Sequence, residues 1–357
     1  MANPLVGEGL FWKKKEYLSF VLSILVFLIH ISSVAQYANS GSAVGIFNEK
    51  AAYFFKESIT RFAVPMFFML SGVSFFKGYD NTKYKKKMAS RVFTLILPYL
   101  VWNTLSMLFE IVCSYSFLSK YFIARKPFES SVMNILGGVF FYKCNGAFWF
   151  MFDLIVFSLA APLVYTLIRN KYVGISAILV ISGLSLFGIE LPASVFYTPN
   201  SIVFYLVGAL IGLHFFDFAA KRSDKKTQVG SVVFLAAYIL CKNVFSARLY
   251  DNPLLEIVIF TSCCFALWNA ADLFIHKIKP RPLYARSFAV YAMHVNLAAI
   301  ISKAIYLVAP KKEWFAIPNL LLTLVCTLVA INVACIVLEK YFPRIYGFLM
   351  GRRTKRS

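Results

Sequence analysis

Long apolar runs alternate with short basic segments along almost the whole chain. Windows of about 20 apolar residues indicate membrane spans. They predict ten transmembrane helices, near residues 17–37, 61–77, 89–112, 147–168, 173–189, 201–218, 229–246, 254–275, 286–308 and 317–339. The runs are continuous, so they favour helices over a barrel, whose strands alternate with period two. The apolar stretch 132–142 is too short to cross a bilayer, and we expect it to be interfacial or re-entrant.

This pattern predicts an all-α fold, a polytopic membrane bundle of about ten transmembrane helices. We expect a cytoplasmic N-terminal segment at 1–16, a transmembrane domain at 17–340 and a basic cytoplasmic tail at 341–357. The composition agrees, since 60% of the 357 residues are hydrophobic and only 15% are charged. Soluble globular chains average about 45–50% apolar and about 25% charged residues. A soluble domain is therefore excluded.

The formal net charge of +21 raises the possibility of nucleic-acid binding. The positions of the basic residues argue against it. With the N-terminus inside, the six inner segments carry 25 of the 37 lysines and arginines, and the outer loop 190–200 carries none. This satisfies the positive-inside rule loop by loop. The chain is thus predicted to lie in the bilayer with both termini cytoplasmic, and no nucleic-acid partner is expected.

The N-terminus allows a second interpretation. Lys13 to Lys15, the apolar run after them and Ser33-Val34-Ala35 resemble a secretory signal with a cleavage site. However, His30 interrupts the apolar core, and the run continues almost to a full span. An uncleaved first helix is the favoured interpretation.

Two of the four histidines, His30 and His294, lie deep inside predicted spans, where an ionisable side chain is a functional-site hypothesis by default. At about 1.5 Å per residue they lie roughly 20 Å and 12 Å from the inner ends of their helices, so both are near the midplane. Each shares a polar helix face with serines and tyrosines. The two stripes suggest a hydrated cavity. The alternative is that each imidazole only bonds a neighbouring carbonyl or serine.

Other polar residues near the spans are harder to interpret. Arg61 can extend its charge to the interface, and Ser71 can belong to a packing face of small residues. The dense basic patch at 77–91 is explained by topology and anionic headgroups at least as well as by ligand binding. The sequence does not indicate a role for Asp153 or Glu256. No Gly-rich phosphate loop, GxSxG or HExxH motif is present, and no metal-binding cysteine pattern.

Five segments together resemble the acyltransferase-3 family of bacterial integral-membrane O-acyltransferases, in particular its branch that acetylates surface polysaccharides. They are His30 late in the first helix, RFAVPMFFMLSGVSFF at 61–76, MASRVFTLILPYLVWN at 88–103, GAFWFMFDLIVFSLAAPLV at 146–164 and SFAVYAMHVNL at 287–297. Many members carry an arginine ten positions before the first-helix histidine, and this chain has Phe20 there.

The resemblance implies transfer of an acyl group, usually acetyl from cytoplasmic acetyl-CoA, to a sugar hydroxyl of a lipid-linked or exported glycan. No permanently bound cofactor is implied; acetyl-CoA or another acyl-CoA is the donor substrate, and the chain is placed in the bacterial inner membrane. His30 becomes the expected catalytic residue. Further site residues implied by the resemblance are Arg61, Arg91, His294, Ser71, Tyr99, Trp149 and Tyr291.

The sequence also allows two other classes of function. Midplane polar residues also suit a secondary transporter or flippase, although no repeat relates the two halves of the sequence and no matching pair of broken helices is evident. The third class is a membrane protein with an assembly or signalling role and no chemistry of its own.

Overall fold

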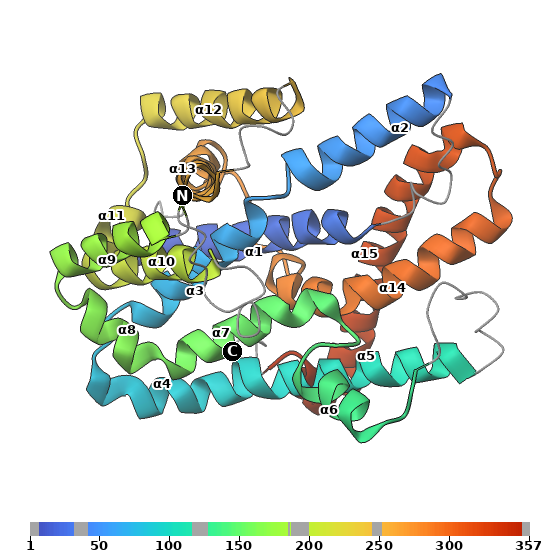
Figure 1. The fold of residues 1–357 in the computed structure, drawn as a ribbon, viewed down its shortest axis with the longest axis horizontal. Coiled ribbons are helices and arrows are strands. Elements are labelled where there is room, and N and C mark those ends of the chain that lie inside the picture. Colours follow the sequence, from blue (N-terminus) through green and yellow to red (C-terminus); the bar gives the residue numbers. More distant parts are fainter. Residues whose placement is uncertain are drawn as a thin grey trace. The chain divides into compact units, whose positions relative to one another are not determined.

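The computed structural model describes residues 7–31, 42–115, 128–184, 186, 200–244 and 252–351. Every regular element in these ranges is a helix, as the apolar pattern predicts (Figure 1). Contacts divide the chain into two compact units. Unit 1 comprises Met1–Val26, Phe54–Met88 and Val156–Ser287, and unit 2 comprises Phe27–Tyr53, Ala89–Ile155 and Phe288–Ser357. Each unit is described by itself.

Six helical segments of the described chain are long and apolar enough to cross a membrane. They are Ala43–Phe76, Asn81–Tyr115, Lys225–Val244, Pro253–Leu273, Tyr284–Val308 and Glu313–Tyr341. A bent pair, Gly146–Leu159 with Ala161–Ile168, makes a seventh if it is one span. The protein is therefore a multi-pass helical membrane protein, and the count of ten stays a prediction.

The predicted fourth span, 147–168, is not one straight helix. The chain bends by 67° between Gly146–Leu159 and Ala161–Ile168. Pro162 stands in the first turn of the second piece, and its missing N–H removes one intrahelical hydrogen bond at the break. The proline was visible in the sequence, but the apolar run continues through it.

Unit 1 contains the middle of the chain and several short helices. Its elements are the first part of α1 (Glu8–His30), η2 (Phe54–Ser58), α3 (Ala63–Phe76), η3 (Asn81–Lys83), most of α4 (Tyr84–Arg91), the end of α7 (Trp149–Leu159), α8 (Ala161–Ile168), α9 (Lys171–Leu184), α10 (Ser201–His214), α11 (Phe216–Ala220), α12 (Lys225–Val244), α13 (Pro253–Ala270), η9 (Ala271–Leu273) and η10 (Tyr284–Arg286).

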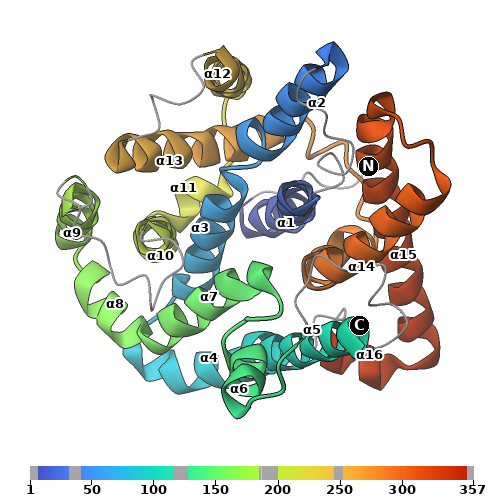
Figure 2. The same ribbon diagram turned by 45° about the vertical axis from the view of Figure 1, so that its right-hand side comes forward.

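Helices α3 and α10 form the closest packing in unit 1 and lie side by side in both views (Figures 1 and 2). Glycines make this approach possible. A Cβ added to Gly208 would lie 2.1 Å from the carbonyl oxygen of Met69, and one added to Gly72 would lie 2.4 Å from that of Tyr205. Small residues at such crossings allow backbones to meet, which increases van der Waals contact between membrane helices.

A buried ion pair connects α1 to η9 within unit 1. Lys14 Nζ lies 3.0 Å from Asp272 Oδ1, and both side chains are fully buried. The other carboxylate oxygen of Asp272 accepts hydrogen bonds from the backbone N–H and the hydroxyl of Ser223, at 3.0 and 2.9 Å. The ammonium of Lys14 also lies 4.2 Å from the centre of the Trp268 ring. This cluster joins three separate stretches of unit 1.

Unit 2 contains the elements that carry most of the predicted site residues. They are the end of α1, α2 (Ala43–Tyr53), η4 (Val92–Ile96), α5 (Leu97–Tyr115), α6 (Val132–Phe140), η6 (Gly146–Phe148), the start of α7, α14 (Ser287–Val308), η11 (Glu313–Phe315), α15 (Ala316–Tyr341) and α16 (Pro343–Leu349). Helix α6 is a short piece of nine residues, as expected for the stretch 132–142. Helix α2 lies in a stretch where no helix was predicted.

Helix α5 packs against both α6 and α16 in unit 2. Before it, the chain forms a π-helical turn at Val92–Ile96, where the N–H of Leu97 bonds the carbonyl of Val92. Pro98 follows immediately and donates no N–H, which accounts for the irregular turn. The Trp102 indole N–H donates to the carbonyl of Leu349 at 3.0 Å and fixes α16 against α5.

Candidate functional site

The two deep histidines meet in unit 2. His30 is the last residue of α1, and His294 lies in α14. Their ring centroids are 5.2 Å apart, with the ring planes inclined by 50°. His294 is fully buried, whereas His30 is exposed at its helix end. Two imidazoles that are distant in sequence thus share one place in the fold.

The hydrogen bonds of His294 determine which of its nitrogens carries the proton. Nδ1 lies 2.7 Å from the carbonyl oxygen of Tyr291 and 3.2 Å from that of Val290. Because a carbonyl only accepts, Nδ1 must be the donor, so the neutral ring keeps its lone pair on Nε2. This nitrogen is buried and has no hydrogen-bond partner among the described residues. The arrangement presents a proton acceptor.

A set of aromatic rings holds this region in place. The Tyr291 hydroxyl donates to the carbonyl of Ala147 at 2.5 Å, and the ring stacks on Phe148 with centroids 5.6 Å apart and planes 11° apart. The ring of Tyr99 lies 6.2 Å from Phe148. We call His30, His294, Tyr291, Phe148 and Tyr99 the ring cluster. Trp149 follows Phe148 directly and begins α7.

A second polar group is formed by residues that lie close to the ring-cluster residues in the sequence. It was not predicted from the sequence. The Ser106 hydroxyl accepts hydrogen bonds from the side-chain amides of Asn145, at 3.1 Å, and Asn296, at 2.9 Å. The Oδ1 atoms of both amides are buried without a partner among the described residues. We call these three residues the amide cluster. Ser106 and Asn145 are each 1% exposed.

A signal for the amide cluster was present in the sequence. Tyr99, Asn103 and Ser106 follow the i, i+4, i+7 spacing of one helix face inside an apolar span. Asn145 directly precedes the segment GAFWF, and Asn296 lies two residues after His294. No pattern indicated that these positions meet, because they come from three separate parts of the chain.

The remaining predicted site residues are distributed over both units. Arg91 ends α4 within unit 2 and is partly buried. Arg61 and Ser71 belong to unit 1, so the structure does not relate them to the ring cluster. The Arg61 guanidinium bonds Glu57 at 2.7 Å, one turn away, and is about half exposed. Phe20, also in unit 1, packs its ring 5.7 Å from Tyr284.

Two acidic residues without a predicted role lie in different units. Asp153 is in the part of α7 that belongs to unit 2 and is 1% exposed. It follows Trp149 by one helical turn. Glu256 lies in the first turn of α13, in unit 1. The two other histidines are also in unit 1, where His214 Nε2 contacts the carbonyl of Ile168 at 2.7 Å.

The basic loop after α3 has defined contacts of its own. Lys87 donates to the carbonyls of Phe75 and Lys77, and Lys77 pairs with Glu8. Lys83 pairs with Asp80 at 2.8 Å, and hydrogen bonds from Lys83 and Thr82 hold the pKa of Asp80 at about 2. These lysines fasten the end of α3, which is a structural role. Lys85 and Lys86 remain exposed.

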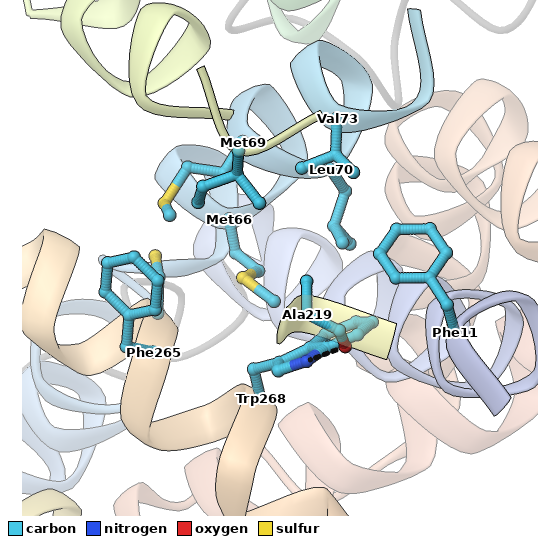
Figure 3. A pocket seen from close by; sticks show the side chains of 10 residues that line it. Phe11, Met66, Met69, Leu70, Val73, Ala219, Phe265 and Trp268 are labelled. Atoms are coloured by element: carbon cyan, nitrogen blue, oxygen red, sulfur yellow. Dashed lines mark hydrogen bonds between the residues drawn. The ribbon is translucent and has the colours of Figure 1, made fainter. Parts of the chain in front are cut away.

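Unit 1 also holds a small apolar pocket, with a volume of about 40 Å³ (Figure 3). Met66, Met69, Leu70 and Val73 of α3 line one side, and Trp268 lies across from them, donating its indole N–H to the carbonyl of Ala219 at 3.1 Å. The remaining walls are Phe11, Ile211, Cys264 and Phe265. These groups provide no acid or base for catalysis, so the ring cluster is the better candidate site.

The parts described define a class: a multi-pass helical membrane protein with imidazoles, hydroxyls and amides gathered inside one helical unit. A sequence model of the acyltransferase-3 family, described as an acyltransferase domain, matches residues 16–339. The chain belongs to this family and is a membrane acyltransferase. No curated protein and no solved structure matches the chain.

Proposed function

We propose that the protein transfers an acetyl group from cytoplasmic acetyl-CoA to a sugar hydroxyl of a lipid-linked or exported surface glycan. It acts in the bacterial inner membrane, with both termini in the cytoplasm as the basic loops predict. The observation that carries this proposal is the contact between the His30 and His294 rings inside one helical unit. Family membership supports the acyltransferase class.

The reaction needs a base and donors for an oxyanion. In this proposal the sugar hydroxyl attacks the thioester carbonyl, and His30 takes the hydroxyl proton as the new C–O bond forms. The C–S bond then breaks, and the proton passes to the sulfur, so that CoA leaves as a thiol. Imidazole suits this role because its ordinary pKa of about 6.5 lies near working pH.

His294 supports His30 in this scheme. Its Nδ1–H is held by the Tyr291 carbonyl, so its Nε2 lone pair is the group able to accept a proton or hydrogen bond from the neighbouring ring. A fixed tautomer beside the base keeps the pair from rotating into unproductive arrangements. The Tyr291 and Tyr99 hydroxyls both donate to backbone carbonyls, at 2.5 and 2.7 Å, and fix the walls of the site.

The donor is expected at the basic side of the membrane. The exposed Lys85 and Lys86 of unit 1 provide positive charge for the phosphates of CoA. Arg91 of unit 2 is proposed separately as a donor-binding residue. Because these side chains are wholly or partly exposed, added salt should weaken donor binding. The acyl-CoA is a substrate in this scheme and is released after each cycle.

The test uses purified protein with radiolabelled acetyl-CoA and envelope glycan extracted from the producing strain and freed of acetyl esters by mild alkali. Wild-type protein should label the glycan and release CoA. His30→Ala should lower transfer by about 10²–10⁴-fold, the usual contribution of a general base. The exposed His276 provides the control, and His276→Ala should retain activity.

Undiminished labelling by His30→Ala would remove His30 from the mechanism. Label that enters sealed vesicles containing the wild-type protein without forming an ester would instead support a transporter. These two outcomes are separable, because ester formation is measured on the isolated glycan and uptake on intact vesicles.

A further inference from the structure

The amide cluster of Asn145, Ser106 and Asn296 has a geometry that packing alone does not require. Both amide nitrogens are used on one hydroxyl oxygen, at 3.1 and 2.9 Å. Each amide therefore has its nitrogen turned inward, toward Ser106, and its oxygen left over. The two remaining oxygens are buried and lack partners among the described residues. Buried polar atoms in membrane proteins are expensive unless they are hydrogen-bonded.

The Ser106 hydroxyl also uses only part of its hydrogen-bonding capacity. Its oxygen accepts two hydrogen bonds, and its own proton is not donated to any group among the described residues. The amide cluster thus offers two hydrogen-bond acceptors and one donor. A ligand that matches it must present hydroxyl or N–H groups together with at least one acceptor oxygen.

The position of the amide cluster along the helices indicates which substrate can reach it. His294 lies seven residues and Asn296 nine residues from the start of α14, or about 10 and 14 Å. Ser106 lies 17 residues, about 26 Å, from residue 89, where its predicted span begins. Both spans begin at segments predicted to be inside. The amide cluster is therefore on the outer side of His294.

Asn145 supports this placement from the opposite direction. It precedes η6 and α7, a helix predicted to run from the outer face inward. Its backbone is fixed at both ends, since its N–H donates to the Tyr142 carbonyl at 3.0 Å and its carbonyl accepts from the Phe148 N–H at 2.9 Å. The same short stretch positions an amide-cluster residue and a ring-cluster residue.

We infer that the amide cluster is the binding subsite for the acceptor glycan, with the oxygens of Asn145 and Asn296 accepting from sugar hydroxyls and Ser106 donating to a sugar oxygen. This inference rests on the proposed function and adds the residues that select its acceptor. The pantetheine arm of CoA carries amide N–H groups and a hydroxyl as well, but acetyl-CoA is expected from the cytoplasmic side, whereas the amide cluster lies on the outer side of His294, where the acceptor is expected.

The test measures the KM values for both substrates in Asn145→Leu, Asn296→Leu and Ser106→Ala. Leucine keeps the branched shape of asparagine at Cγ and lacks both polar atoms. Each leucine variant should raise the KM for de-esterified glycan about three- to tenfold, the effect of one lost neutral hydrogen bond, and leave the KM for acetyl-CoA within about twofold. Ser106→Ala should raise the glycan KM at least as much, because both amides lose their shared anchor.

A matched control comes from the same unit. Asn48 is a 4% exposed amide in α2 whose Nδ2 donates to the carbonyl of Glu313 at 2.9 Å. Asn48→Leu should leave both KM values unchanged. If a leucine variant does not fold, as judged by its elution from a sizing column, the corresponding alanine variant takes its place.

The outcomes separate this inference from the proposed function. Wild-type transfer with unchanged glycan KM in all three variants would show that the amide cluster only packs helices. A raised KM for acetyl-CoA with unchanged glycan KM would assign the amide cluster to the donor and overturn the inference. Wild-type protein that esterifies no glycan hydroxyl would overturn the proposed function and the subsite with it.

Discussion

Each unit of this protein buries a group of polar residues, and the two groups differ in the partners that the protein provides for their polar atoms. In unit 1, the Lys14 ammonium faces the Asp272 carboxylate and the Trp268 ring, and the second carboxylate oxygen accepts two hydrogen bonds from Ser223. In unit 2, the Nε2 of His294 and the side-chain oxygens of Asn145 and Asn296 have no partner among the described residues. Burial is similar, but only the first group has its charges paired by the protein, because Lys14 and Asp272 face each other 3.0 Å apart.

This difference separates a structural role from a functional one. A buried charge whose partners all come from the protein holds elements together, and removing one partner costs stability. Buried acceptors that the protein leaves open are costly for folding, so their retention points to a ligand or a reaction. Variants in unit 2 should therefore affect turnover, and variants in unit 1 should affect the amount of folded protein.

Among the residues of these two buried groups, the largest effect is expected at His294. His294→Asn and His294→Gln place an amide near the position of Nδ1 or Nε2 respectively, and neither amide takes up a proton. Both should lower acetyl transfer by about 10²-fold or more while the unfolding temperature changes little. The measurement is transfer per folded protein, with thermal unfolding in detergent alongside.

The two amides also discriminate between roles. If Nε2 only accepts a hydrogen bond, His294→Gln should recover most of the activity, because its side-chain oxygen is also an acceptor. If the ring only packs, both variants should remain active. Either result would place proton transfer on His30 alone.

The second effect is expected in unit 1, at Lys14. Lys14→Met leaves the fully buried Asp272 carboxylate without its counter-charge and should reduce the free energy of unfolding by about 3–5 kcal/mol. Transfer per folded protein should stay at the wild-type value. Thermal unfolding and the yield of monodisperse protein measure the first quantity, and the acetyl-transfer assay measures the second.

The double variant sharpens this prediction. Lys14→Met with Asp272→Leu removes both charges and should regain most of the lost stability, because an apolar pair of similar volume often replaces a buried ion pair without loss. A double variant as unstable as the single one would assign the cost to lost packing. A fall in transfer per folded protein would connect the pair to catalysis and remove the contrast between the two units.

A third, smaller effect is expected where α3 and α10 cross. Gly208→Ala would bring its Cβ to 2.1 Å from the Met69 carbonyl oxygen, a backbone atom that cannot rotate away. We expect a loss of about 1–3 kcal/mol, as for other overpacked cores. The control is Gly230→Ala in α12, which meets no atom within 4 Å and should stabilise the helix by up to about 1 kcal/mol. Equal unfolding temperatures would contradict the close packing of α3 and α10.

The sequence predicted the elements better than it predicted the site. Continuous apolar runs predicted an all-helical membrane protein, because only internally bonded helices satisfy the backbone in lipid. The bend near Pro162 was missed because hydropathy averages over a window and is insensitive to one absent N–H. Helix α2 was missed because its segment, AVGIFNEKAAY, contains charges that interrupt the apolar pattern.

The site shows a similar limit. His30 and His294 were identifiable, since histidine is rare inside spans and each shares a helix face with other polar residues. The amide cluster was not, because Ser106 lies 39 residues from Asn145 and 190 from Asn296 along the chain. Asparagine and serine are ordinary packing residues in membrane helices. Only the three-dimensional arrangement shows that their nitrogens converge and their oxygens remain open.

The smallest effect is expected from pH, at an exposed group of unit 1. Hydrogen bonds from Lys83 and Thr82 lower the pKa of Asp80 from its ordinary value of 3.8 to about 2. A carboxyl with a lowered folded-state pKa stabilises the fold fully above its unfolded pKa, and this contribution is lost as pH falls through the folded value. Wild-type protein should therefore unfold at a slightly higher temperature than Asp80→Asn at pH 6, and the gap should close between about pH 4 and pH 2.

Asp224→Asn provides a parallel case for this measurement. Hydrogen bonds from the backbone and hydroxyl of Thr227 lower the pKa of the Asp224 carboxyl, which is also exposed. The difference in unfolding temperature between wild type and Asp224→Asn should also shrink as the pH falls, because both carboxylates stabilise the first turn of a helix in unit 1. A gap that widened on acidification would mean that protonated Asp80 is the form the fold prefers. In that case the basic loop would not depend on the Asp80–Lys83 pair, and Lys83 would be available for the phosphates of the donor.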